Sequence, residues 1–198
     1  TGYCDLIAQD VIENSEDVTP LLIAAQNGQA QLIFSSSSKW EHLDFGIQPA
    51  SWMRRPHFFG DARVRQAIAQ CVDRAYIARE APLYGEAVVA DSYVAPEHPL
   101  HAGEWLRRWE YNPAAGGSLL DAVGWRDEDG DGIREAHGVT GAANWTPFTV
   151  TLLTTAGYPP HERMAHILAE NLAACGIGLA VEYLPPEEFS ADGPEGPG

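Results

Sequence analysis

The sequence predicts an α/β domain in which a layered sheet is flanked by helices. Apolar residues recur at helical spacing over residues 60–76 and again over 160–175. Residues 148–154 and 177–183 are short runs of β-branched and apolar residues on either side of the second of these segments. Strands that alternate with helices in this way are typical of layered α/β folds.

Composition limits both the domain organisation and the partners. The chain has 198 residues, 45% of them hydrophobic, which supports one core. We therefore expect a single α/β lobe over residues 1–190 and a flexible tail over 191–198, which contains no large apolar residue. The formal net charge of −16 excludes nucleic acid as a partner, because phosphates require basic patches, and favours cationic ligands.

The first quarter of the chain predicts one helix among short strands. The helix covers residues 19–27, with Thr19 as its N-cap, Pro20 in its first turn and Gly28 as its stop. Three runs have the composition of strands: residues 4–8, 31–38 and 41–47.

The strongest helix signal follows at residues 60–76. Asp61 can cap this helix and pair with Arg65 one turn later. Its apolar stripe, which we expect to be buried, consists of Val64, Ala67, Ile68, Cys71, Val72, Ala75 and Tyr76.

Two further helices are predicted in the second half. The first begins after its cap Asn112 and stops at Gly124, and the second covers 160–175 and stops at Gly176. Between residues 81 and 111 the sequence predicts a long loop rich in aromatic residues, which in a compact domain is usually functional or poorly ordered.

Three cysteines leave the disulfide pattern open. Cys71 and Cys175 lie on apolar helix stripes, where we expect small buried hydrophobic residues. Cys4 could pair with either of them. Because the count is odd, at most one internal disulfide can form.

An acidic segment at Asp127-Glu128-Asp129-Gly130-Asp131-Gly132 begins like a calcium loop, with acids at positions 1, 3 and 5 and glycine at position 6. The acid that closes such loops at position 12 is missing, because Gly138 stands there, although Glu135 lies at position 9. The sequence therefore favours a tight acidic turn, and no metal site is assigned.

Histidines and catalytic motifs give no stronger signal. His161 and His166 are five residues apart, whereas zinc-protease helices need histidines four apart on one face, so we expect both to face solvent. His98 and His101 could hold a metal in a loop, but no third ligand matches them. The sequence contains no nucleophile elbow, P-loop or dinucleotide fingerprint, so we predict no enzyme, no catalytic residue and no cofactor.

Several motifs resemble one known family. Residues 61–74 read D-A-R-V-R-Q-A-I-A-Q-C-V-D-R and are similar to the signature helix of the extracellular solute-binding proteins of family 5, the peptide and nickel receptors of ABC importers. Residues 40–46, W-E-H-L-D-F-G, resemble a strand of that family. Residues 111–125 resemble its Y-D-P to A-G-W segment, except that Gly116 and Gly117 replace helix formers, which would weaken this helix by roughly 1 kcal/mol per glycine.

The resemblance implies a two-lobed receptor with the periplasmic-binding-protein type II fold, of which this chain would be much of one lobe. Such a receptor captures a solute, most often an oligopeptide, between its lobes and passes it to a membrane permease. The implied location is extracellular or periplasmic, with a membrane tether in the full-length protein. The implied partners are the solute, the second lobe and the permease.

By the same resemblance, Trp40, Asp44 and Tyr93 are the candidate ligand-binding residues: an aromatic wall, a carboxylate for an ammonium group and a phenol that can stack or donate. Three structural roles compete with these: Trp40 in the core, Asp44 paired with an arginine, and Tyr93 packing its loop. Two other functional classes remain open, a calcium-binding extracellular module, which metal would stabilise, and a peptide hydrolase, which would show turnover.

Overall fold

The computed structural model describes residues 15–33, 39–47, 55–83, 87–96 and 98–189. The expected strand at 4–8, with Cys4, most of the expected strand at 31–38, and the tail at 191–198 lie outside the described residues. In chain order the elements are α1 (Ser15–Gln26), α2 (Ala62–Cys71), α3 (Arg74–Glu80), the 3₁₀ helix η2 (Gly103–Trp105), α4 (Pro113–Val123), β1 (Trp125–Arg126), β2 (Glu135–Ala136), β3 (Thr149–Thr155), α5 (Pro159–Ala173), β4 (Gly178–Leu184) and α6 (Pro186–Phe189).

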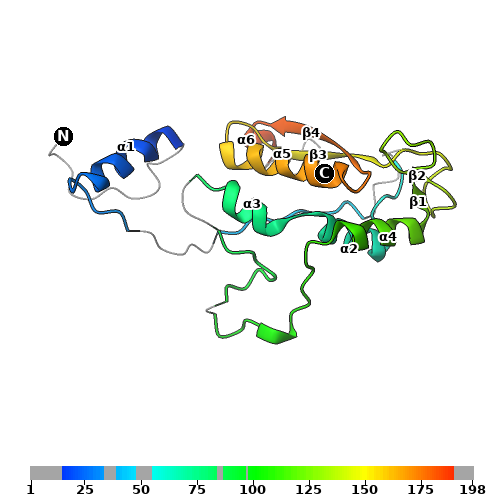
Figure 1. The fold of residues 1–198 in the computed structure, drawn as a ribbon, viewed down its shortest axis with the longest axis horizontal. Helices are drawn as coiled ribbons and strands as arrows, with labels where there is room; N and C mark the ends of the chain where they lie inside the picture. Colours follow the sequence, from blue (N-terminus) through cyan, green and yellow to red (C-terminus); the bar gives the residue numbers. More distant parts are fainter. Residues whose placement is uncertain (1–14, 34–38, 48–54, 84–86, 97, 190–198) are drawn as a thin grey trace.

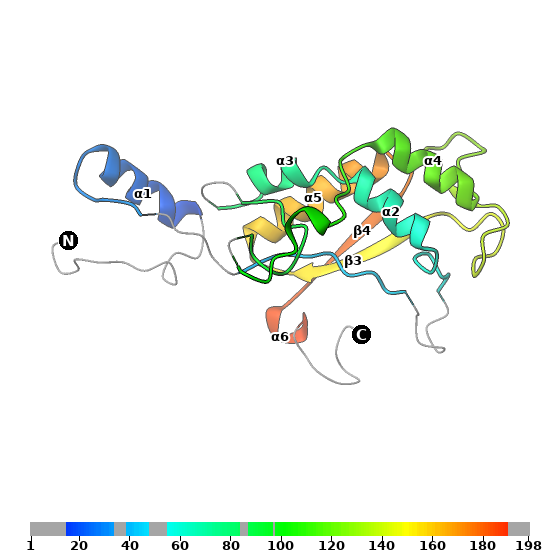
Figure 2. The same ribbon diagram turned by 90° about the horizontal axis from the view of Figure 1, so that it is seen from below.

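Strands and helices form layers, as an α/β fold requires. β3 and β4 pair in parallel, from Thr149 opposite Gly178 to Thr155 opposite Leu184, and α5 makes the crossover between them. α5 packs on β3 and β4 with one side and on α2 and α3 with the other (Figures 1 and 2). A second, antiparallel pair joins β1 to β2 beside the end of α4. The predicted α/β class is confirmed.

The predicted helix at 60–76 is two helices. Val72 takes an extended conformation (φ −96°, ψ 120°), and Asp73 then caps α3 by accepting a hydrogen bond from the Tyr76 backbone N–H at 2.9 Å. The break is fixed from outside, because the Asp73 backbone N–H donates to Asn171 of α5 at 2.7 Å. The buried stripe therefore ends at Val72, and the prediction that Ala75 and Tyr76 belong to it is wrong, since both are exposed, Tyr76 at 39%.

Asp61 caps α2 as predicted, but its charged partner differs. Its carboxylate accepts from the Arg63 backbone N–H at 2.8 Å and pairs with the Arg63 guanidinium at 2.6 Å. The side-chain hydrogen bond from Arg63 lowers the pKa of Asp61 below its usual range. The predicted pair with Arg65 is wrong, because Arg65 donates instead to the carbonyls of Phe59 and Gly60.

α1 begins four residues earlier than predicted. It starts at Ser15 and places Pro20 inside the helix, so Thr19 is not its cap. The predicted stop is confirmed, because Gly28 has a left-handed φ of +69° and Gln29 donates its backbone N–H back to Ala24 at 2.8 Å.

The core is aromatic and lies between the helices and the strands. Phe58 stacks on Phe148 with ring centroids 5.3 Å apart, and Trp125 contacts Phe148 at 4.4 Å. Ile68 of α2 and Leu120 of α4 belong to the same buried cluster. Because these residues come from segments far apart in sequence, the cluster joins the two halves of the described chain.

A disulfide joins Cys71, at the end of α2, to Cys175, after α5, with Cα atoms 6.2 Å apart. The expectation that the two cysteines are simple buried hydrophobic residues is therefore incomplete: both are buried, at 0% and 3% exposure, and they are covalently linked. The two cysteines are 104 residues apart in sequence, and their bond links the end of α2 to the connection between α5 and β4.

Candidate ligand-binding surface

The segment at residues 39–47 carries two of the three predicted site residues. It has no strand pairing with any described residue, so the expected strand at 41–47 is not observed. Contacts with its neighbours hold it instead: Phe45 packs on Phe59 with ring centroids 5.2 Å apart, and Glu41 lies 3.2 Å from the ring nitrogen Nε2 of His161. These two contacts fix the segment on either side of Asp44.

Aromatic rings from two distant segments meet at this surface. The Trp40 ring lies 4.4 Å from the His42 ring and 6.5 Å from the Tyr93 ring, measured between centroids. Trp40 is 49% exposed and Tyr93 is 77% exposed. Trp40 is therefore not a core residue, and most of the Tyr93 side chain is available to another molecule.

Asp44 continues this cluster through a histidine. His42 Nε2 lies 2.9 Å from Asp44 Oδ2, and the Asp44 side chain is 88% exposed. Asp44 thus contacts a histidine, whereas the competing structural role predicted a pair with an arginine. We call Trp40, His42, Asp44 and Tyr93 the aromatic–acid cluster.

His42 is the member of this cluster that sequence reasoning missed. The sequence spacing could have indicated His42, because it lies two residues after Trp40 and two residues before Asp44. Alternate side chains of an extended chain lie on the same side.

The long loop that carries Tyr93 is tied to α3. The Arg74 guanidinium donates to Asp91 at 3.0 Å and to the Trp109 carbonyl at 2.8 Å, and Arg108 pairs with Asp91 at 3.1 Å. These bonds position the loop two residues before Tyr93. The described part of the loop is therefore anchored at Asp91 by two arginines.

Two hollows of about 230 and 400 Å³ lie against this loop, both lined by Asp91 and Arg108. Neither lining includes Trp40, Asp44 or Tyr93. The predicted site residues are exposed and lie outside both of these hollows.

The histidines that could have held a metal have other contacts. His161 is largely buried and bonds to Thr155 at 2.5 Å, so its predicted solvent-facing position is wrong, whereas His166 is exposed as predicted. His98 and His101 each accept a backbone hydrogen bond two residues on. Among the described residues, the one group of three potential ligands that lie close together is Asp127, Asp129 and Glu135.

The chain thus combines an α/β fold with an exposed aromatic and acidic surface. The chain belongs to the bacterial extracellular solute-binding proteins, family 5, since the profile of the family's middle region matches residues 8–196. This family comprises solute-binding proteins rather than enzymes. Within the described residues, none of the helices combines the length and the apolar character needed to cross a membrane.

Relatives agree with this assignment. The chain is 32% identical over 147 residues to the oligopeptide-binding protein AppA of Bacillus subtilis, a match that covers 71% of this chain and 24% of AppA. The oligopeptide-binding protein of Thermus thermophilus in complex with a pentapeptide is 30% identical, with a TM-score of 0.57, over 67% of this chain and 21% of that one. NikA of Brucella suis in complex with Fe(III)-EDTA is 27% identical, with a TM-score of 0.55, over 66% and 24%. The chain thus spans about a quarter of the length of these relatives.

Proposed function

We propose that the chain contributes one wall of a ligand groove in an oligopeptide receptor of an ABC importer. The observation that supports this most directly is the aromatic–acid cluster, in which an exposed carboxylate stands beside exposed rings on a chain of this family. Relatives solved with a pentapeptide and with a nonapeptide favour a peptide as the solute.

The chemistry of the cluster suits a peptide end. Asp44 offers a carboxylate oxygen to an ammonium group, and Trp40 and Tyr93 offer ring faces to the adjoining side chains and to the cation itself. The Asp44 carboxylate already contacts His42, so an ammonium group that binds Asp44 would replace His42 as its partner.

The remaining partners follow from this proposal. A second lobe would supply the opposite wall, closure by a hinge would exclude water from the ligand, and a permease would receive it. The protein would act outside the cytoplasmic membrane, held there by a tether on the full-length receptor.

Calorimetry on the full-length receptor tests the role of Asp44. We expect Asp44→Asn to weaken binding of a peptide with a free N-terminus about tenfold or more, because it removes one charge-assisted hydrogen bond, and to affect the N-acetylated peptide much less. The matched control is Glu170→Gln, which neutralises the acid of another exposed His–carboxylate pair, with His166 on α5. If Asp44→Asn weakened binding of both peptides equally, or if Glu170→Gln weakened binding as much as Asp44→Asn, this role of Asp44 would be contradicted.

A further inference from the structure

The acidic turn between β1 and β2 is built by its own hydrogen bonds. The Asp127 carboxylate accepts from the backbone N–H groups of Gly130 at 2.7 Å and Gly132 at 3.1 Å. Asp131 accepts from the backbone N–H of Ile133 at 2.7 Å. These bonds explain how the turn folds, and they do not by themselves indicate a ligand.

Glu135, the first residue of β2, is not explained by the turn. It is 6% exposed, and its Oε2 atom is buried without a hydrogen-bond partner in the described part of the chain. Buried polar atoms in proteins almost always have a partner, and a buried carboxylate without one is costly. The neighbouring Arg134 is not that partner, because the bonds of its guanidinium go to Asp121 and to the carbonyls of Trp125 and Cys175.

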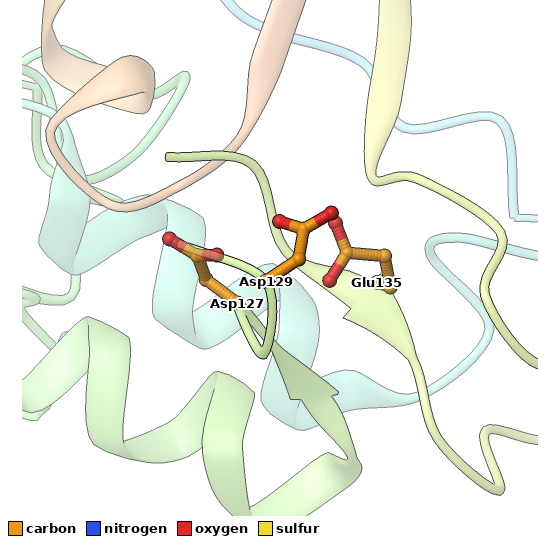
Figure 3. Close-up of side chains that lie close together, drawn as sticks. All are labelled: Asp127, Asp129 and Glu135. Atoms are coloured by element: carbon orange, nitrogen blue, oxygen red, sulfur yellow. The ribbon is translucent and has the colours of Figure 1, made fainter. Parts of the chain in front are cut away.

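The carboxylate of Glu135 lies beside two others. Oxygen atoms of Asp127, Asp129 and Glu135 all lie within 4.8 Å of one another. Figure 3 shows Asp129 and Glu135 with their carboxylates facing each other across the turn. Three negative groups this close repel one another unless a cation lies between them.

We propose that Asp127, Asp129 and Glu135 bind a calcium ion, with Glu135 as the buried ligand that closes the site. Calcium takes six to eight oxygen ligands at about 2.3–2.6 Å, so two of its ligands can be up to about 4.6–5.2 Å apart. The three carboxylates, which all lie within 4.8 Å of one another, fit within this separation. Magnesium is usually bound through only one or two carboxylates and keeps several waters, so a group of three carboxylates favours calcium. Water and backbone carbonyls complete the coordination.

Counting along the sequence places the three acids at positions 1, 3 and 9 of a calcium loop, but it does not show that Glu135 can close the site. A helix–loop–helix calcium site takes its closing acid from position 12, which is Gly138 here. In this chain the loop is followed by a strand, β2. The pairing of β2 with β1 buries Glu135, at position 9, and brings it back over the turn. The ligand is therefore supplied by strand pairing rather than by a second helix.

Thermal unfolding of this chain with and without calcium tests the site. A ligand that binds only the folded state raises Tm, and at a hundred times its Kd calcium should raise it by about 5 °C or more. We expect this shift in the parent chain and in Glu128→Gln, which removes the same charge from the same turn outside the group of three. Glu135→Gln and Asp129→Asn should lose it. Asp129→Asn keeps an oxygen for the Asp131 N–H, so it serves if the buried variant fails to fold.

Three outcomes would overturn the proposal. The first is an unchanged Tm of the parent chain in millimolar calcium. The second is an equal loss of the shift in Glu128→Gln and Glu135→Gln, which would indicate diffuse charge screening. The third is an equal rise of Tm with magnesium. Calorimetry of the parent chain should also give one calcium per chain. None of these results depends on peptide binding, so this proposal and the proposed function fail separately.

Discussion

At the scale of single residues, Gly116 shows how packing overrides helix propensity. By propensity alone, the two glycines of α4 only weaken the helix. A Cβ atom at Gly116 would lie 2.6 Å from Cys71 Sγ and 2.9 Å from the Ala67 carbonyl, so the glycine allows α4 to approach α2. A Cβ atom at Gly117 would meet only the end of the Arg134 side chain, at 3.2 Å.

The two glycines should therefore respond in opposite ways to alanine. We expect Gly116→Ala to lower the free energy of unfolding by about 1–3 kcal/mol, because the added methyl group overpacks the α2–α4 contact. Gly117→Ala should be neutral or raise it by up to about 1 kcal/mol through helix propensity. Urea unfolding of the two variants measures the difference, and a more stable Gly116→Ala would show that the contact can relax.

At the scale of elements, the sequence predicts what neighbouring residues determine. The start and stop of α4 are predicted correctly, since Asn112 accepts from the Ala115 N–H at 3.0 Å and Gly124 has a φ of +108°. The break between α2 and α3 is missed because it depends on Asn171, 98 residues away. The strand expected at 41–47 fails for a related reason, because a strand needs a partner and composition does not show whether one is present.

The candidate site, too, is predicted only in part from the sequence. The resemblance places Trp40 and Asp44 on one segment, but only the fold brings Tyr93 to Trp40. The burial of Glu135 likewise comes from the pairing of β2 and cannot be read from its position beside the acidic turn.

The disulfide gives an element-scale prediction. Its closure of a loop of about 100 residues is worth roughly 3–5 kcal/mol, so reduction should lower the Tm clearly. The matched control is the double variant Cys71→Ala/Cys175→Ala, whose Tm should not respond to the reductant. Alkylation and mass spectrometry should label both cysteines only after reduction. An unchanged Tm of the parent chain, with both cysteines labelled, would contradict the stabilising role.

At the scale of the whole molecule, the aromatic–acid cluster is exposed, and the chain spans about a quarter of the length of its relatives. A peptide lying on one exposed wall still competes with water and buries too little area to offset its lost freedom. Tight capture needs a second wall, because small-molecule sites bury most of the ligand surface. The proposed function therefore predicts that affinity belongs to the full receptor, although this chain supplies specific contacts.

The most direct test is isothermal titration calorimetry with the same set of short peptides on this chain and on the full-length receptor. We expect micromolar or tighter binding by the receptor and no binding by this chain below about millimolar peptide, because the chain offers one wall only. A circular-dichroism melt of the chain, run alongside, should show cooperative unfolding and so exclude misfolding as the cause. Submicromolar binding of a peptide by the chain alone would contradict the account.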